Sequence, residues 1–366
     1  MNKNIDIVHY NAEMIGGSNV VFWYYVAALN GAGVTPDVYM NVGAGKSPAP
    51  PDLFYGVSGP RYTLHRTATL PLPKQELFGS YLRALENYLS FKQAGAGGSG
   101  ALVSTGNVIP FAPCLSYTHN PANISLDPRA KSQLPLAVYL RLASAAGRSR
   151  LLANSSAVRE RIRRRWRLDS TVIYPPVDDE SFSRPFDEKR TRSGIISLGR
   201  FCAAKRQSTA QVEIARQMRD TTFSMVGGLE NYSRDSRNEF AALKARIEEL
   251  DLRNVVLYPN LPREKLLSLF AETRFFVHSM KDEDFGIATA EAVIAGLVPV
   301  VHDSGGSREI VPDPALRWRT TDEAVRMIRS SGSLDTAPLR AHCVRSFSYR
   351  VYQKRMLEET ERYAPG

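Results

Sequence analysis

The chain has 366 residues, a length that predicts two domains rather than one. Its hydrophobic content of 43% and charged content of 23% are those of a globular protein and exclude wholesale disorder. No apolar run approaches the roughly 20 residues that span a bilayer, and the N-terminal stretch MNKNIDIVHYN lacks the apolar core of a signal peptide. We therefore expect a cytoplasmic protein, with a formal net charge of +10.

In the first half of the chain, apolar runs of strand length alternate with longer helix-like segments. The predicted strands are IDIVHY, PDVYMNV, ALVSTG, CLSYTH, RLLANS and TVIYPPV. Helices are predicted in SNVVFWYYVAALNGAG, from about Lys131 to Ala146, and in a basic segment after RLLANS. Strands that alternate with helices favour a parallel, doubly wound sheet with helices on both faces.

A Pro-, Ser- and charge-rich stretch, PPVDDESFSRPFDEKRTRS, predicts a linker, after which the alternation restarts. The later predicted strands are GIISLGRF, TFSMVGG, NVVLYPN, RFFVHS and VPVVH. The expected fold class is therefore α/β with two Rossmann-like doubly wound domains, residues 1–178 and 179–345. No strand follows the last predicted helix, Tyr349–Tyr363, so we expect residues 346–366 to pack back on the first domain.

The segment Arg141–Arg167 concentrates positive charge, with nine arginines and a single acid, Glu160. Within it, VRERIRRRWRL predicts a cationic helix that presents Trp166 and Leu168. Three interpretations stay open: a solvated helix face, an anionic membrane surface and a nucleic-acid site. The aromatic residues are not interleaved with the basic ones as a stacking platform requires, so we expect no nucleic-acid partner.

Several patterns resemble functional motifs but lack their context. GAGGSG, residues 95–100, follows a helical pattern rather than a strand, so it does not predict a dinucleotide site. GAGKS, residues 43–47, lacks the first glycine of a P-loop. The acids of KDEDF lack further oxygen ligands nearby, and we expect no metal site. The three widely spaced cysteines are predicted to be free, buried thiols: Cys114, Cys202 and Cys343.

Other candidates lie where strands end, because ligands of doubly wound sheets bind beyond the carboxyl ends of the strands. Gly16 and Gly17 come between the first strand and a long helix, where backbone amides approach phosphate easily. His119 follows the strand in CLSYT. Arg200 and Lys205 follow GIISLG, spaced so that they can converge on one diphosphate. Each also has an ordinary structural interpretation: a turn, a buried histidine, a solvated basic pair.

The stretch KDEDFGIATAEAVIAGLVPVV carries the strongest signal. It places Glu283 in an acidic loop and Glu291 one to two turns into an apolar helix. Backbone amides near Gly286 and Ile287 suit phosphate oxygens, and a carboxylate suits the vicinal hydroxyls of a sugar. Because a buried carboxylate is costly without a partner, we expect Glu291 to have one.

The spacing of seven residues between Glu283 and Glu291, with the following run AEAVIAGLVPVVHDSGGSREIV, resembles family 4 of the retaining glycosyltransferases, which have the GT-B fold. The resemblance extends to IGGSNVVF, ANSSAVRERI, VIYPPVD, LGRFCAAKR, SMVGG and LPREKLLSLFAETRFFVHS. It covers most of the chain and is stronger in the second half. It implies an acceptor-binding domain and a nucleotide-sugar-binding domain that face a cleft, with a C-terminal helix that crosses back.

In the second domain, the resemblance implies a role for each candidate. Glu283 would hold hydroxyls of the transferred sugar, and Glu291 would hold the ribose of the nucleotide. Arg200 and Lys205 would neutralise the diphosphate leaving group, and the Gly286–Ile287 amides would help to bind its phosphates.

In the first domain, Gly16 and Gly17 would form a loop facing the diphosphate, and His119 would contact the donor sugar near the reacting centre. The reaction implied is transfer of a hexose with retained anomeric configuration. Stabilisation of the developing negative charge would be the main catalytic device, and the resemblance implies that no metal is required.

The sequence departs from the commoner Glu-Gly-Phe-Gly motif, because Asp284 occupies the place of the first glycine. Glu-X-Phe-Gly-Ile variants and the stretch YTHNPANIS resemble GDP-mannose-dependent mannosyltransferases that build lipid-linked oligosaccharides. The resemblance therefore implies GDP-mannose as the donor and a glycan, glycolipid or small molecule as the acceptor. For a lipid-linked acceptor, the Arg141–Arg167 segment would attach the enzyme to the cytoplasmic face of a membrane.

Three alternatives remain. A nucleotide-sugar epimerase or hydrolase, or a phosphorylase, would use the same two-domain architecture. A basic nucleic-acid-binding protein is the alternative from another class.

Overall fold

The computed structural model describes residues 4–10, 16–42, 47–67, 86, 88–95, 100–106, 112–120, 144–145, 147–187, 191–229 and 233–364. The chain forms two compact units, which we call the first unit (residues 1–175 and 352–366) and the second unit (residues 176–351). The predicted helix Lys131–Ala146 and the motif-like patterns GAGKS and GAGGSG lie almost entirely outside the described residues.

The described part of the first unit is built on a parallel sheet with the strand order β3-β2-β1-β4-β5-β6-β7. The interior strand β1 is buried at all five positions, as expected where helices cover both faces. The strands are β1 (Ile5–His9), β2 (Asp37–Met40), β3 (Thr63–Arg66), β4 (Ala101–Ser104), β5 (Leu115–Thr118), β6 (Arg150–Ala153) and β7 (Thr171–Val172).

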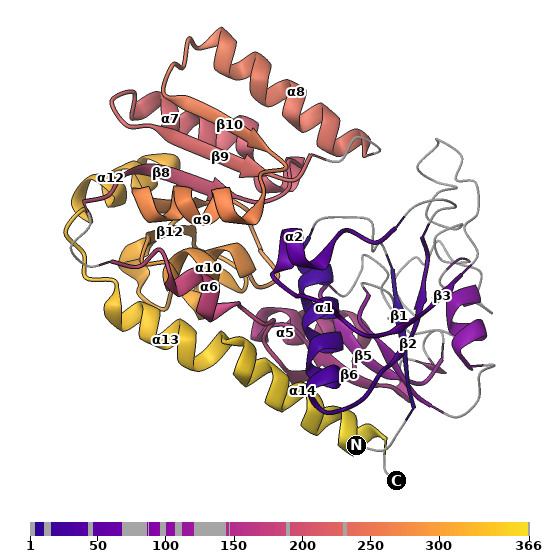
Figure 1. Cartoon of the computed structure of the whole chain (residues 1–366). Helices are drawn as coiled ribbons and strands as arrows, with labels where there is room; N and C mark the ends of the chain where they lie inside the picture. Colours follow the sequence, from indigo (N-terminus) through magenta and orange to yellow (C-terminus); the bar gives the residue numbers. More distant parts are fainter. Residues whose placement is uncertain are drawn as a thin grey trace. The chain divides into compact units, whose positions relative to one another are not determined.

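The helices of the first unit include α1 (Gly17–Gly31), α2 (Pro51–Tyr55) and α5 (Ser156–Trp166). The last helix, α14 (Tyr349–Tyr363), belongs to this unit from Tyr352 onward and lies beside α1 (Figure 1). The Tyr352 hydroxyl donates to the Val21 carbonyl at 3.1 Å, and the hydroxyls of Tyr25 and Thr360 are 2.9 Å apart. These buried hydrogen bonds confirm that the C-terminal helix packs back on the first domain.

The basic helix α5 differs from the prediction in one respect. Its N-terminus is capped by Ser155, whose hydroxyl accepts from the Val158 amide at 3.0 Å. Val158, Ile162 and Trp166 recur every four residues and form one buried face. Trp166 is only 4% exposed, so the prediction that the helix presents this side chain is wrong. The outward residues are mainly arginines.

The second unit contains a parallel sheet with the strand order β10-β9-β8-β11-β12-β13. Its strands are β8 (Ser193–Leu198), β9 (Phe223–Gly227), β10 (Val255–Pro259), β11 (Thr273–His278), β12 (Val298–His302) and β13 (Arg317–Trp318). In both units, an order in which chain-distant strands are neighbours is that of a doubly wound sheet. This arrangement confirms the predicted fold class.

The second unit also contains short and regular helices. They are α6 (Asp179–Ser183), η1 (Ala203–Lys205), η2 (Gln207–Gln211), α7 (Val212–Gln217), α8 (Arg234–Glu249), α9 (Arg263–Glu272), α10 (Ile287–Ile294), α11 (Ser307–Ile310), η3 (Pro314–Leu316), α12 (Thr321–Ser330) and α13 (Ala337–Phe347). The stretch predicted as a linker contains α6, which Asp178 caps by accepting from the Ser181 amide at 3.1 Å.

Two strands escaped the sequence prediction. β3 reads TLHR, and β13 has only two residues, Arg317 and Trp318. Both are edge strands, and their short, polar sequences carry no run of apolar residues. The prediction for the cysteines is confirmed, since Cys114, Cys202 and Cys343 are all free and buried.

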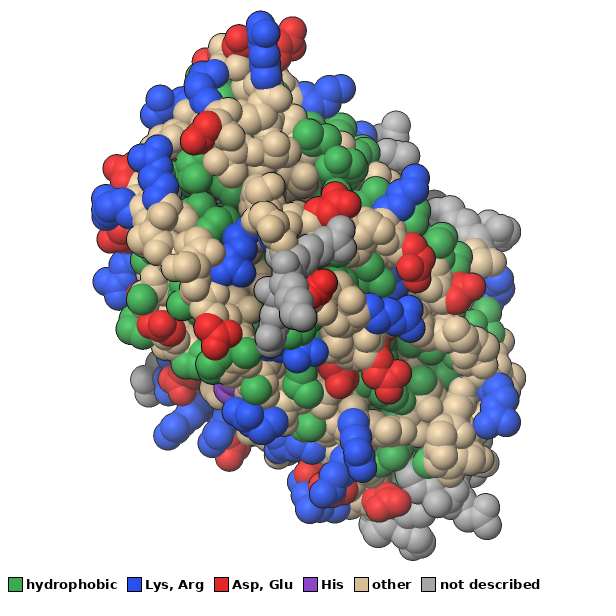
Figure 2. All heavy atoms as spheres, turned by 60° about the vertical axis from the view of Figure 1, so that its left-hand side comes forward, with side chains coloured by type: hydrophobic (Ala, Val, Ile, Leu, Met, Phe, Trp, Pro, Cys, Tyr) green, Lys and Arg blue, Asp and Glu red, His purple; other side chains and the backbone are tan. Residues whose placement is uncertain are grey.

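One face of the molecule carries charged side chains of both signs. Figure 2 shows Lys and Arg side chains interspersed with Asp and Glu across that face, with no broad region of one sign. Among the described residues, each helix is too short or too polar to cross a lipid bilayer.

Candidate active site

Glu283 lies in the loop between β11 and α10, and it is only 8% exposed. One carboxylate oxygen, Oε2, accepts a hydrogen bond from the Lys205 ammonium and lies 2.8 Å from Nε2 of His278. The other oxygen, Oε1, accepts from the Asp284 amide at 3.1 Å. The loop therefore holds a buried carboxylate in one orientation.

The charges around Glu283 keep it ionised. Burial alone would raise the pKa of Glu283, but the Lys205 ammonium and the His278 side chain hold it well below its usual range. Burial lowers the pKa of His278, and the positive charge of Lys205 acts in the same direction. At neutral pH the Glu283 carboxylate is thus an anion beside the Lys205 ammonium. The His278 imidazole, at the end of β11, lies against the same carboxylate.

Lys205 is positioned by a chain of buried polar groups. It ends η1, and its carbonyl accepts a hydrogen bond from the Ser279 hydroxyl. Gln211 donates to that hydroxyl at 2.8 Å and accepts from the Ser197 hydroxyl at 2.7 Å. These bonds tie together β8, η2 and the end of β11, so the lysine backbone is fixed relative to the loop that carries Glu283.

The N-terminus of α10 points into the same loop. Gly286 is the N-cap, with a positive φ of 103° that favours glycine, and no side chain caps the helix. The first amides of a helix lack intrahelical acceptors, and they carry partial positive charge. The first amides of α10 therefore lie beside Glu283, and anion binding by the Gly286 and Ile287 amides stays a prediction.

A pair of glycines after β12 makes this arrangement possible. Gly305 has a φ of 62°, and a Cβ on it would lie 2.2 Å from the Glu283 carbonyl oxygen. A Cβ on Gly306 would lie 2.4 Å from the Asp284 carbonyl oxygen, and the Gly306 amide donates to the Glu283 carbonyl at 2.8 Å. The backbone that carries Glu283 therefore packs directly against glycine backbone.

Gly306→Ala should displace the Glu283 loop, because the added methyl group has no room. We expect a loss of roughly 1–3 kcal/mol in stability, as for overpacking elsewhere, and a fall in turnover. Thermal unfolding and steady-state kinetics measure the two effects. Gly332→Ala is the matched control, since no atom lies within 4 Å of a Cβ there. Equal behaviour of the two variants would show that the close contact does not constrain the loop.

Glu291 lies on α10, partly buried, near the ion pair of Arg263 and Asp178. Burial raises its pKa to about 7, against the attraction of Arg263, and Asp178 adds to the rise. Within the described part of the chain, no group forms a hydrogen bond or ion pair with this carboxylate. The partner expected from the sequence is thus not a side chain of the described residues.

The raised pKa makes a prediction about stability. An acid with a pKa of about 7 in the folded protein and about 4.3 when unfolded costs stability progressively as the pH rises between those values. Glu291→Gln should therefore raise the melting temperature at pH 8 and much less at pH 5. Calorimetry at both values measures the difference. Glu264→Gln, the same change at an exposed position, should show no such pH dependence. An equal gain at both pH values would contradict an elevated pKa.

The remaining candidates divide between the two units. Arg200 is in the second unit with an exposed side chain, and its carbonyl accepts from Gln207 at 2.8 Å. In the first unit, Gly16 is the N-cap of α1, Gly17 is its first residue, and His119 follows β5 at 7% exposure. Space is open beside Gly16, where a Cβ would meet no atom within 4 Å.

The structure thus brings Lys205, Glu283, Gly286 and Ile287 together, with Glu291 one turn further along α10. His278 and Ser279 contact Glu283 and Lys205, and the sequence had not predicted them as candidates. Their signal was the end of the predicted strand RFFVHS, because polar residues at a strand's carboxyl end lie at the ligand edge of the sheet.

Asp282, the acid next to Glu283, differs from Glu283 in its exposure to solvent. Asp282 is exposed, and its amide donates to the Ser304 hydroxyl at 2.7 Å. Among the described residues, no three His, Cys, Asp or Glu side chains are grouped as metal ligands.

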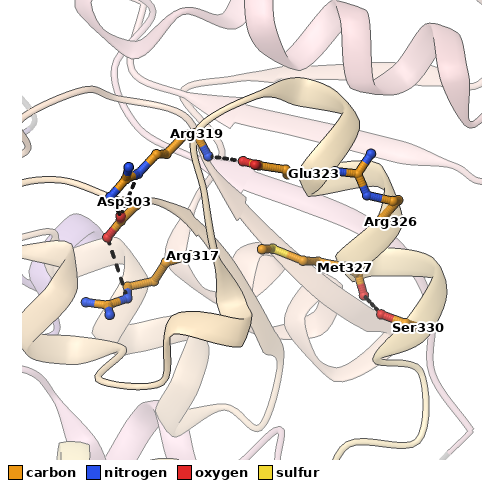
Figure 3. A pocket seen from close by; sticks show the side chains of 7 residues that line it. All are labelled: Asp303, Arg317, Arg319, Glu323, Arg326, Met327 and Ser330. Carbon is orange, nitrogen blue, oxygen red and sulfur yellow. Dashed lines mark hydrogen bonds and ion pairs between the residues drawn. The ribbon is translucent and has the colours of Figure 1, made fainter.

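A separate cavity of about 400 Å³ lies in the second unit beside β13 and α12 (Figure 3). Its acids are already paired. Asp303 faces Arg308 and Arg319 at 2.9 Å, and Glu323 accepts from the Arg319 and Thr320 amides in a capping box. None of the predicted site residues lines this cavity.

Comparisons with known proteins match the part of the chain that carries these residues. Residues 178–318 match the family described as Glycosyl transferases group 1, and this range includes Lys205, Glu283 and Glu291. The GDP-Man:Man(3)GlcNAc(2)-PP-Dol alpha-1,2-mannosyltransferases of Caenorhabditis elegans and Homo sapiens are 28% and 26% identical over 181 and 172 residues. The matched regions are 44% and 43% of this chain, but only 37% and 35% of those relatives. The chain thus spans little more than a third of their length.

Among solved structures, sucrose-phosphate synthase from Thermosynechococcus elongatus superposes with a TM-score of 0.76 at 16% identity, covering 99% of both chains. That similarity shows the fold, which is GT-B. Residues 178–318, which include the Glu283–Lys205 pair at the N-terminus of α10, therefore match the family described as Glycosyl transferases group 1, in a chain with the GT-B fold.

Proposed function

We propose that the protein is a retaining mannosyltransferase that moves mannose from GDP-mannose to a hydroxyl of a glycan or glycolipid. The observation that carries the proposal is the ionised Glu283 held against Lys205 at the uncapped N-terminus of α10, inside the family match. This arrangement supplies an acceptor for sugar hydroxyls beside donors for phosphate. The donor and acceptor classes follow from the names of the mannosyltransferases to which the chain is similar.

In the proposed site, the diphosphate occupies the amides of Gly286 and Ile287. Lys205 then exchanges part of its contact with Glu283 for the phosphate oxygens, and Arg200 contributes a second cation. Glu283 accepts from hydroxyls of mannose. The unpaired Glu291 accepts from the ribose, which provides the partner that the described part of the chain lacks.

During transfer, the bond between C1 of mannose and the phosphate oxygen breaks, and a bond from C1 to the acceptor oxygen forms on the same face. The acceptor's proton passes to an oxygen of the leaving diphosphate, so charge and atoms balance. Lys205, Arg200 and the helix amides stabilise the negative charge that develops on the leaving group, and we expect no metal to be required. His119, Gly16 and Gly17 would contact the donor from the acceptor-binding domain, proposed as residues 1–178.

A panel of nucleotide-sugars tests the proposal. The protein is incubated with GDP-mannose, GDP-glucose, UDP-glucose and UDP-GlcNAc, with and without mannosylated lipid acceptors, and nucleotide release is followed. GDP released from GDP-mannose, faster with acceptor, is the expected result. Equal release without acceptor would indicate a hydrolase instead. Failure to bind or turn over any donor would overturn the glycosyltransferase proposal.

We also propose peripheral attachment to an anionic membrane through α5, whose outward residues include Arg159, Arg163, Arg164 and Arg167. Because Trp166 is buried, the contact would be electrostatic rather than an insertion. The protein should sediment with vesicles containing phosphatidylserine at low salt and not with phosphatidylcholine alone. The double variant Arg163→Gln/Arg164→Gln should sediment less with the phosphatidylserine vesicles. Identical sedimentation of the wild type with both lipids would contradict the attachment.

A further inference from the structure

The first unit contains a buried series of hydrogen bonds whose central residues, His9, Asn19 and Thr105, have no role in the function proposed above. His9, at the end of β1, is 1% exposed, and its Nε2 lies 2.6 Å from Oδ1 of Asn19. Its Nδ1 lies 2.9 Å from the hydroxyl of Thr105, the residue that follows β4. The Thr105 carbonyl in turn lies 3.2 Å from Nε2 of His119, after β5. Three neighbouring strands therefore join at their carboxyl ends through polar side chains and one carbonyl.

The hydrogen-bond acceptors next to His9 and His119 indicate which ring nitrogen of each histidine carries the hydrogen. Burial lowers the pKa of both His9 and His119 to about 4, so both rings are neutral at pH 7. A carbonyl can only accept, so Nε2 of His119 carries its hydrogen and Nδ1 carries the lone pair. By the same reasoning, His9 donates to Asn19 from Nε2 and accepts the Thr105 hydroxyl hydrogen at Nδ1.

The chain continues to the glycine loop. The Tyr55 hydroxyl, at the end of α2, hydrogen-bonds both the Asn19 side chain and the Gly16 backbone. The His9 ring also stacks on Phe22, with ring centroids 4.3 Å apart. Asn19 and Phe22 belong to α1, the helix that Gly16 caps. One buried histidine is thus linked to both elements of the first unit that the sequence predicted to face the donor.

We propose that His9 is a positioning residue for the transferase reaction: it anchors Thr105, whose carbonyl fixes the His119 tautomer, and it holds the Gly16 loop through Asn19. This inference rests on the proposed function. Buried polar groups are costly when left unpaired. A series of hydrogen bonds in which each polar group is paired therefore favours one arrangement of its side chains. The proposed role of His9 is to reduce the number of orientations available to the His119 side chain before the donor binds.

The test is His9→Phe in the full chain, which keeps an aromatic ring for the Phe22 stack but removes both hydrogen bonds. We expect kcat with GDP-mannose to fall about 10- to 100-fold, with KM within about threefold, because misplacement of a contact near the reacting centre affects the transition state most. His9→Gln retains an amide donor and acceptor, and it should restore most of the lost kcat.

Two further measurements separate positioning from general loss of structure. Tyr25→Phe removes a buried hydrogen bond of the same unit, to Thr360 at 2.9 Å, and should lower the melting temperature without changing kcat. Nitrogen-15 NMR of histidine-labelled protein should show His119 as the pure Nε2–H tautomer in the wild type and as a mixture in His9→Phe, with His119→Gln used for assignment.

The outcomes keep the two proposals distinct. If the wild type turns over no nucleotide-sugar, the proposed function fails, whereas the NMR readout still reports on the hydrogen-bond chain. If the wild type is active but His9→Phe matches Tyr25→Phe in kcat and keeps the single His119 tautomer, the positioning role is overturned and the function stands.

Discussion

Glu283→Gln is expected to lower kcat with GDP-mannose about 100- to 1,000-fold, the range seen when one charge-stabilising group is removed from an active site. Glutamine keeps the shape of the side chain but carries no charge. Lys205 would then lack its anionic partner, and the amide would be a weaker acceptor for the sugar hydroxyls of the proposed donor. Circular dichroism and thermal unfolding establish that the variant is folded before kinetics are compared.

The matched control for Glu283→Gln is Asp282→Asn. It removes one negative charge from the adjacent residue, which is exposed and has a left-handed backbone that asparagine tolerates. Its activity should stay within about twofold of the wild type, as for surface changes away from a site. A Glu283→Gln protein with wild-type turnover would remove Glu283 from the site, and equal losses in both variants would indicate a general effect of loop charge.

Lys205→Met should lower kcat about 100-fold, which corresponds to about 2.7 kcal/mol of transition-state stabilisation. Methionine preserves most of the aliphatic length that lies against Gly199, so packing changes little. The loss arises because the leaving diphosphate develops negative charge where the ammonium lies. Lys244→Met, on the exposed face of α8, is the control and should leave kcat unchanged.

The double variant Glu283→Gln/Lys205→Met sharpens this prediction. The two side chains share a hydrogen bond, so their effects should not add, and the double variant should be much less impaired than the product of the single losses. Strict additivity would mean that the two residues act independently and that the pair is not a functional unit.

Much of the fold followed from local patterns. Apolar runs such as IDIVH and FSMVG are buried at every position, and such runs form strands wherever helices cover both faces of a sheet. β3 and β13 were missed because their strand character comes from pairing at a sheet edge, which leaves little signal in a short polar sequence. The orientation of α5 was also predicted wrongly. A tryptophan among arginines suggests an exposed helix, and only packing in the folded protein shows that Trp166 lies on the buried face.

By itself, the sequence determined which edge of the sheet carries the candidate residues. The spacing of Glu283 and Glu291, and the position of Lys205 after a strand, are consequences of chain order in a doubly wound sheet, which brings strand ends to one edge. Tertiary structure alone decided the charges and partners there. Lys205 and Glu283 are 78 positions apart, yet they form an ion pair that keeps Glu283 ionised. Glu291 has no hydrogen-bond partner in the part of the chain that the structure describes, and burial raises its pKa. His9 and Thr105 are 96 positions apart, and their hydrogen bond likewise depends on the pairing of β1 with β4. A pKa or a tautomer depends on which groups meet after burial, and residue spacing along the chain does not contain that information.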